Sequence, residues 1–235
     1  LYSDKVDFSK NTIVYEVKSK ALYEKVPFVL GMMEEIMYNT RFDDYKRLKE
    51  IIARIKSRLE ASLMGQGHSI AMLECCAQFS ESAYYSDILR GYKYYEFIKK
   101  LDEEFEQNKT QIVDKLNKLV GYIFNKDNAI VSLTADDEGY DCFVKALSAK
   151  SCNIKDEHYN TAVRSFIPVN VKTGYTSASQ VQYVARCGNF VKDGYKYTGA
   201  LKVLKVIFSY DYLWINVRVK GGAYGCMSGS SRNGD

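Results

Sequence analysis

The sequence has 235 residues, of which 46% are hydrophobic, 14% aromatic and 26% charged, a composition typical of a folded globular chain with a sizeable core. Its net charge of +4 comes from 33 basic and 29 acidic residues, too even a balance to indicate binding to nucleic acid or to a membrane surface. No apolar run reaches the roughly 18 residues of a membrane-spanning helix, and the N-terminus has no signal-peptide pattern.

The first part of the chain combines strands with several helices. Residues 12–17, TIVYEV, alternate and are β-branched, which predicts a strand. Apolar residues at helical spacing predict helices over residues 26–38, 43–63, 69–79, 92–105 and 108–124. The second helix has Asp43 available as an N-cap. Residues 128–134, NAIVSLT, predict a second strand, and a short helix is expected over 139–149. This order predicts an α+β domain with a helical layer over a sheet.

A polar stretch over residues 148–163 is the best candidate for a domain boundary. Beyond it we expect a strand over 181–187, a long helix over 198–219, and a last strand over 223–228 after a glycine turn. This second piece repeats the strand–helix–strand order of the first and is too short to be a whole domain. The chain starts at Leu1 and ends just after Asn233-Gly234, a hairpin signal without its returning strand, so we expect an excised fragment.

The cysteines give no sign of a disulfide framework. No two of them form a CxxC pair, and the adjacent Cys75 and Cys76 are poorly arranged for a mutual disulfide. The remaining cysteines are Cys142, Cys152, Cys187 and Cys226. Buried or idle thiols in a reducing compartment fit this pattern, and we expect a cytoplasmic protein.

The helix over residues 198–219 carries two charges on its apolar side. Its polar side chains share one narrow sector, and most other positions are apolar, so we expect a helix that is buried on nearly all sides. Asp211 and Arg218 lie two turns apart, opposite the polar sector. A charge on a buried side must be paired or must face a cavity. The spacing leaves open whether Arg218 is a helix-end arginine paired with Asp211 or a functional residue.

Two glycines and a tyrosine follow this helix. Gly221 and Gly222 end the helix and allow a close approach of the backbone, either in a tight turn or beside an extended ligand. Tyr224 then begins the expected strand. An ordinary helix end followed by a strand tyrosine explains the same residues. A phosphate loop is excluded, because GxxxxGK[ST] does not occur in the sequence.

At these residues the sequence resembles a known family. Residues 197–225, YTGALKVLKVIFSYDYLWINVRVKGGAYG, are similar to the C-terminal half of the insulinase/pitrilysin family of zinc metallopeptidases, in the branch that contains the presequence proteases. Residues 47–83 resemble the helical third domain of that branch, as does NAIVSLTADDEG at 128–139. The resemblance covers essentially the whole chain, and its R-x-K-G-G-A-Y-G core is far more specific than the glycines alone.

The resemblance implies LuxS/MPP-like metallohydrolase-type domains of the α+β class, each with a helical layer packed on a mainly antiparallel sheet. Residues 1–152 would be part of the third, helix-rich, presequence-protease-associated domain. Residues 153–235 would be the first part of the fourth domain. In this family two halves close around a chamber, and the first half carries an inverted zinc motif, HxxEH, with a distal glutamate ligand.

The resemblance also implies catalytic roles. Matched by motif, Arg218 and Tyr224 are the arginine and tyrosine that the last domain contributes from across the chamber. Arg218 would hold a backbone carbonyl of the substrate, Tyr224 would stabilise the oxyanion of the tetrahedral intermediate, and such a donor contributes about 3 kcal/mol in comparable sites. Gly221 and Gly222 would let the peptide backbone pass close by. The implied partners are a peptide substrate and the N-terminal, zinc-bearing half of the same chain.

The implied cofactor is zinc in the parent protein, with none in this fragment. HxxEH does not occur here, and neither His68 nor His158 has a histidine at i+4. Because a catalytic zinc needs three protein ligands and an open position, we expect this chain to bind no catalytic zinc and to cleave nothing on its own. His68 is expected to cap or pack at a helix start, and His158 to be exposed in the polar linker.

Three functions stand beside one another at this point. The first is the C-terminal half of a zinc endopeptidase that degrades peptides or unfolded segments, which retention of both Arg218 and Tyr224 favours. The second is a non-catalytic structural or partner subunit of the same family fold. The third is a helical interaction module, supported by the 20 tyrosines. An upstream HxxEH motif and its distal glutamate would distinguish the first function from the second.

Overall fold

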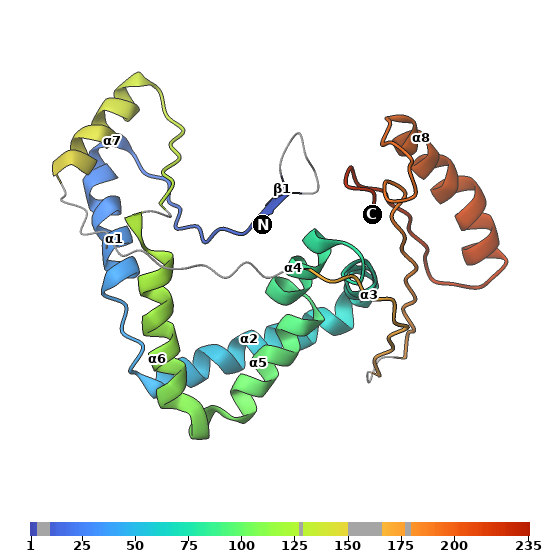
Figure 1. The fold of residues 1–235 in the computed structure, drawn as a ribbon, viewed down its shortest axis with the longest axis horizontal. Coiled ribbons are helices and arrows are strands. Elements are labelled where there is room, and N and C mark those ends of the chain that lie inside the picture. The colour runs from blue at the N-terminus through green and yellow to red at the C-terminus, as the bar shows by residue number, and fades with distance from the viewer. Residues whose placement is uncertain (4–9, 127–128, 150–165, 177–179) are drawn as a thin grey trace. The chain divides into compact units, whose positions relative to one another are not determined.

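The computed structural model describes residues 1–3, 10–126, 129–149, 166–176 and 180–235 (Figure 1). Its elements are β1 (Tyr2–Ser3), β2 (Asn11–Thr12), η1 (Tyr23–Lys25), α1 (Val26–Tyr38), α2 (Tyr45–Gly65), α3 (Gly67–Cys76), α4 (Glu81–Arg90), α5 (Tyr92–Glu103), α6 (Phe105–Ile123), α7 (Asp137–Ala149), α8 (Ala200–Ile207), η3 (Phe208–Tyr212) and η4 (Trp214–Val219). None of the described helices is long and apolar enough to cross a membrane.

The start of α2 is fixed by an aspartate, although not by the expected one. Asp44 Oδ1 accepts a hydrogen bond from the backbone N–H of Arg47 at 2.9 Å, which satisfies a donor that the first turn leaves free. Asp43 instead pairs with Arg41, whose guanidinium lies 3.1 Å from Oδ2. The helix therefore begins one residue later than the sequence indicated.

The helices α1 and α7 pack together beside the turn η1. Pro27 lies in the first turn of α1, where its missing N–H has no cost. Asp136 precedes α7 and accepts the backbone N–H of Gly139 at 2.9 Å, as a capping residue does. Hydrogen bonds from Tyr23 and from that N–H hold the pKa of Asp136 below its usual value. One side chain therefore joins the start of α7 to η1.

The chain divides into two compact units. One comprises Leu1–Ile13, Ser57–Phe97 and Ser165–Asp235, and the other comprises Val14–Lys56 and Ile98–Arg164. The predicted boundary between residues 152 and 153 lies outside the described residues, so the assignment of 1–152 and 153–235 to two domains stays a prediction.

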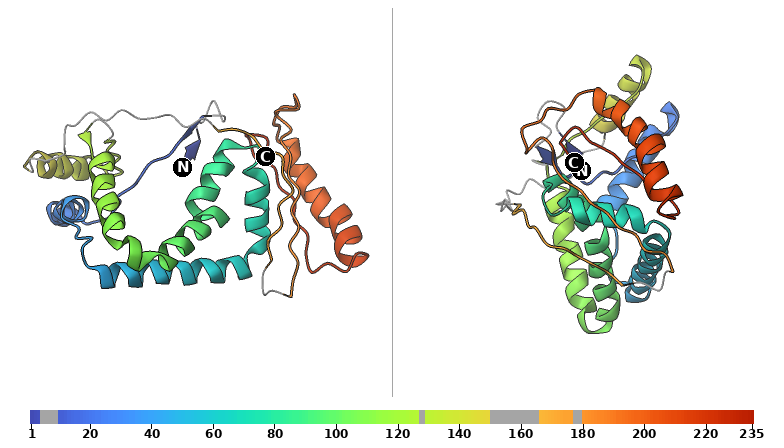
Figure 2. Two further views of the ribbon diagram at one scale, coloured as in Figure 1. Left: turned by 60° about the horizontal axis from the view of Figure 1, so that its bottom comes forward. Right: turned by 90° about the vertical axis from the view of Figure 1, so that its right-hand side faces the viewer.

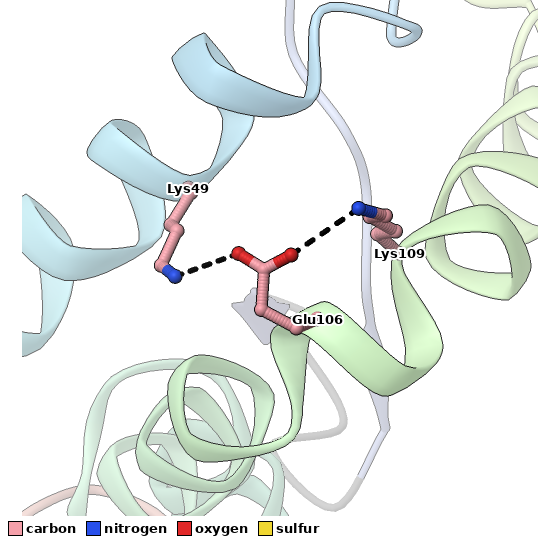
Figure 3. Close-up of polar contacts among 3 residues, drawn as sticks. All are labelled: Lys49, Glu106 and Lys109. Carbon is pink, nitrogen blue, oxygen red and sulfur yellow. Dashed lines mark hydrogen bonds and ion pairs between the residues drawn. The ribbon is translucent and has the colours of Figure 1, made fainter.

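In the second of these units, α2 and α6 enclose apolar residues. Phe105, the first residue of α6, is 1% exposed, and Ile52 of α2 is also buried. Glu106 joins the same two helices through Lys49, whose Nζ lies 2.7 Å from Oε1, and it also binds Lys109 at 3.2 Å (Figure 3). These two charged donors hold the pKa of Glu106 below its usual value.

In the first unit, α3 and α4 pack together and bind extended chain. Gln78 anchors residues 166–176: its backbone carbonyl accepts the N–H of Val169 at 2.7 Å, and its Oε1 accepts the N–H of Val171 at 2.8 Å. At the start of α4, Ser80 Oγ donates to Asp235 Oδ2 at 2.6 Å. Side chains of the helices therefore satisfy backbone groups and carboxylates of segments distant in sequence.

The predicted α+β class, with a helical layer on a mainly antiparallel sheet, is wrong for the described residues, which are mainly helical (Figures 1 and 2). In this part of the chain the only paired strands are β1 and β2, with Tyr2 opposite Thr12 and Ser3 opposite Asn11. The LuxS/MPP-like layered domain is therefore not what these residues form.

The expected strands explain this difference. Apart from Thr12 in β2, no strand forms in the described parts of 12–17, 128–134, 181–187 and 223–228. Alternating apolar residues favour an extended backbone, but a sheet also needs a second strand that supplies backbone hydrogen bonds. Residues 181–187 instead contact α2 and α3 through the side chains of Tyr183 and Cys187.

Candidate functional site

The candidate site lies at the end of the long C-terminal helix. This helix starts at Ala200 as α8 and continues without a break through η3 and η4, whose wider π-type turns run to Val219. The prediction that it is buried on nearly all sides is wrong here, because its apolar side chains are largely exposed, Tyr210 by 77% and Val219 by 65%. An amphipathic pattern shows which residues are apolar, whereas burial depends on what packs against them.

Arg218 is exposed and its guanidinium stacks on an aromatic ring. Its Cζ lies 4.0 Å from the centroid of the Trp214 ring, one turn earlier in the same helix. Within the described part of the chain no ion pair joins Arg218 to Asp211, so the stacking replaces the ion pair that the spacing allowed. The planar fork of the guanidinium keeps donors free at its edge.

Gly221 and Gly222 end the helix, and each is needed for geometric reasons. The N–H of Gly222 binds the carbonyl of Arg218 at 3.0 Å, and the N–H of Ala223 binds that of Val217 at 3.2 Å. Gly222 has φ +71°, the left-handed conformation that glycine adopts without strain. A Cβ at Gly221 would lie 2.6 Å from the carbonyl oxygen of Val217, so only glycine fits there. A helix-ending turn therefore accounts for both glycines, and substrate binding by them stays a prediction.

Tyr224 follows this turn and is 95% exposed. No strand begins at Ala223, and in the described residues no hydrogen bond or ring contact joins Tyr224 to Arg218. The turn nevertheless brings the two side chains within six residues of one another, and both are open to solvent. The roles predicted for Arg218 and Tyr224 therefore stay predictions.

The two histidines do not form a metal centre in the described chain. His68, in the first turn of α3, lies against Tyr183, with ring centroids 6.0 Å apart. His158 lies outside the described residues. Among the residues that are described, no group of three or more histidine, cysteine, aspartate or glutamate side chains could hold a metal ion. These residues do not fit a catalytic zinc, which would need ligands from elsewhere.

A second polar cluster, which the sequence analysis did not single out, joins α3, α4 and α5 to residues 166–176. Asp87 of α4 is 1% exposed, and Lys93 Nζ lies 3.1 Å from its Oδ2. Burial, followed by the charge of Asp87, raises the pKa of Glu74 in α3. Burial and the charge of Glu74 likewise raise the pKa of Tyr175, whose ring lies 3.8 Å from that of Tyr92.

This cluster has the character of a structural link. Its members come from three helices and one extended segment, and each charge has a neighbour of opposite sign or a hydrogen-bonding hydroxyl. The sequence signal that could have revealed it is Asp87 in the run AYYSDIL, a carboxylate among residues that pack against other helices.

Two family models match this chain. A family of peptidase-associated domains, from subfamily 16C of the metallopeptidases, matches residues 1–101. The "PreP C-terminal domain" matches residues 174–234, which include Arg218 and Tyr224. The two matches lie on the parts of the chain that the resemblance assigned to the third and fourth domains.

Known proteins from distant organisms are similar along most of the chain. Protein HypA of Clostridium perfringens is 37% identical over 93% of this chain and 22% of its own length. Presequence protease 1, chloroplastic/mitochondrial, of Arabidopsis thaliana is 26% identical over 89% of the chain and 19% of its own length. The mitochondrial presequence protease of Drosophila melanogaster is 26% identical over the whole chain and 22% of its own length. The chain thus spans about a fifth of the length of these relatives.

Proposed function

We propose, from the premise that this chain is a presequence-protease-like segment of the insulinase family, that it serves in the C-terminal half of a zinc-dependent endopeptidase. The parent enzyme degrades peptides or unfolded segments. Arg218 and Tyr224 contribute substrate binding and oxyanion stabilisation across a chamber from the half that carries zinc. Gly221 and Gly222 give the peptide backbone room to pass.

One observation carries this proposal. Arg218 and Tyr224 are both exposed, although each is a side chain that folding alone would be expected to bury or pair, and both lie in the segment matched by the PreP C-terminal domain. The stacking of Arg218 on Trp214 supports a fixed direction for its donors. A side chain held in place beforehand loses less entropy when substrate binds.

The chemistry of these residues suits peptide hydrolysis. When zinc is bound by the other half of the enzyme, it supplies an activated water and polarises the scissile carbonyl. Arg218 donates hydrogen bonds to a neighbouring carbonyl of the peptide and so fixes its position. Tyr224 donates its hydroxyl proton in a hydrogen bond to the oxygen on which negative charge develops.

The first prediction tests Tyr224 in the full-length protein. Tyr224→Phe removes one oxyanion donor and keeps the ring, so kcat on an unstructured peptide should fall by about 10²–10³ with little change in stability. Steady-state kinetics and urea unfolding check the two parts. The matched control is Tyr210→Phe, because Tyr210 is also exposed, on the helix before the glycine turn, and has no assigned role. Wild-type turnover in Tyr224→Phe would rule out the catalytic role.

Arg218→Lys tests the second residue in the same assay. An ammonium cannot reproduce the forked donors or the stacking on Trp214, so kcat/KM should fall, by about tenfold or more. Arg186→Lys is the control, since Arg186 is exposed on the extended segment that precedes the helix. If both Arg218→Lys and Tyr224→Phe leave turnover unchanged, the non-catalytic family subunit is the better description of the protein.

The remaining parts of the proposal concern partners and compartment. The partners are a peptide substrate and the N-terminal half of the same chain, with no role for nucleic acid or a membrane. We retain the cytoplasm as the proposed location, although the printed names of the plant and fly relatives place those proteins in organelles.

A further inference from the structure

Three cysteines far apart in the sequence lie together in the first unit. Cys75 and Cys76 end α3, and Cys187 lies on the extended segment that runs beside this helix (Figure 2). The Sγ of Cys187 donates to the backbone carbonyl of Met72 at 3.6 Å. That carbonyl is one turn before Cys76 and points toward it along the helix axis, so the contact brings Cys187 beside Cys76.

The position of Cys187 is set by contacts on both sides of it. Upstream, the hydroxyl of Tyr183 lies 3.5 Å from the carbonyl of Met64, and its ring packs against Gly67 and His68. Downstream, Lys192 Nζ donates to the carbonyl of Phe79 at 2.6 Å. Register along α3 is therefore fixed at two points that enclose Cys187.

The exposure of this segment alternates as well. Tyr183, Ala185, Cys187 and Asn189 are half-buried, whereas the residues between them are exposed. Because successive side chains of an extended chain point to opposite sides, one side of the segment faces the helix and Cys187 is on that side.

The two thiols also differ in acidity. A hydrogen bond from the Cys187 thiol lowers the pKa of Cys76, against the opposing effects of burial and of the nearby charges of Asp235 and Cys75. The same interaction, together with burial, raises the pKa of Cys187. Burial also raises the pKa of Cys75. Of the three, Cys76 is the thiol that most readily forms a thiolate, and it is partly open to solvent.

We propose that Cys76 and Cys187 form a reversible disulfide when a peroxide oxidises the protein. The Cys76 thiolate attacks one oxygen of hydrogen peroxide, which gives a sulfenic acid and releases hydroxide. Cys187, as it loses its proton, attacks the Cys76 sulfur and expels a second hydroxide, and protonation of the two hydroxides gives water. Two thiols thus lose two electrons to one peroxide, and a dithiol reductant reverses the reaction.

The bond would connect the segments matched by the two family models. It would close a long loop and fix the extended chain that leads to the helix carrying Arg218 against α3. Disulfides in reducing compartments are usually transient and redox-sensing, which is the role that this pair would have. The proposal does not depend on the proposed peptidase function.

Mass spectrometry of the full-length protein tests this inference. The reduced protein is treated with hydrogen peroxide, its free thiols are alkylated, and it is digested without reductant. We expect a linked pair of peptides that contains Cys76 and Cys187 and that dithiothreitol separates. The pair should disappear in Cys76→Ser and in Cys187→Ser and remain in Cys75→Ser and in Cys142→Ser, whose cysteine lies on α7.

A measurement on the unaltered protein covers the case in which a variant does not fold. Alkylation of Cys76 in the native, reduced protein should rise at a lower pH than that of free cysteine. No linked pair in the oxidised wild-type protein, or a pair that contains Cys75 in place of Cys76, would overturn the proposal. Alkylation of Cys76 only at a higher pH than free cysteine would overturn its role as the attacking thiol.

Discussion

At the scale of single residues, burial changes the chemistry of Glu74 more than its position in the sequence indicates. Burial between helices raises its pKa, because a carboxylate loses its hydration there, and the charge of Asp87 adds repulsion. Lys93 lowers the same pKa only in part. The ionised form of Glu74 therefore costs stability, and the cluster is held most firmly when this carboxyl is protonated.

This predicts a pH-dependent effect of Glu74→Gln. An acid whose pKa is raised on folding contributes stability below its unfolded pKa, near 4.5, and loses it as the pH rises through the folded value. Glutamine has no charge to bury, so the variant should gain stability relative to the wild type between about pH 4 and about pH 7. Urea unfolding at both pH values measures this difference.

The control for this prediction is Glu24→Gln, an exposed glutamate on η1. Its effect on the free energy of unfolding should be small and nearly the same at both pH values. A Glu74→Gln variant that loses stability relative to the wild type as the pH rises would show that the ionised carboxylate is favoured in the folded protein.

At the scale of elements, the helices hold one another by contacts of very different burial. Lys56 of α2 and Asp102 of α5 form an ion pair at 2.7 Å, with side chains only 25% and 19% exposed. Lys49 and Glu106 form an equally short pair between α2 and α6 that is largely open to solvent. Water and salt screen the second pair more strongly than the first.

We therefore expect Lys56→Ala to cost about 1–3 kcal/mol of unfolding free energy, because it leaves a partly buried carboxylate without its donor. Lys49→Ala, the matched control on the same helix, should cost less. Urea unfolding at low and at high salt checks both. Equal losses for the two variants would show that burial does not distinguish these pairs.

The helices were the elements that the sequence predicted well. Each of them satisfies its own backbone hydrogen bonds, so apolar spacing and a capping residue suffice to indicate where it lies, as for α2 and α6. The helix α4 was missed because its run ESAYYSDILR has a weak apolar period, although Ser80 stands at its N-cap position. The predicted strands failed for the opposite reason, since a strand is stable only beside a partner.

At the scale of the whole molecule, the described residues carry no set of ligands for a catalytic metal. We expect the 235-residue chain, expressed on its own, to retain no stoichiometric zinc after dialysis and to cleave no peptide, because a catalytic zinc needs three protein ligands. Elemental analysis and a peptide assay check this, with the full-length protein as the zinc-containing control. One tightly bound zinc per isolated chain would contradict the expectation.

The sequence by itself determined the family of this protein, the positions of most helices, and the motif that contains Arg218, Gly221, Gly222 and Tyr224. These features depend on residues that are close together in the chain, where periodicity and spacing are visible. Only the tertiary structure decided that the C-terminal helix is exposed, that Glu74 meets Asp87, and that Cys187 lies beside Cys76. Burial and pairing of this kind arise between segments far apart in sequence, and no local pattern specifies which of them come into contact.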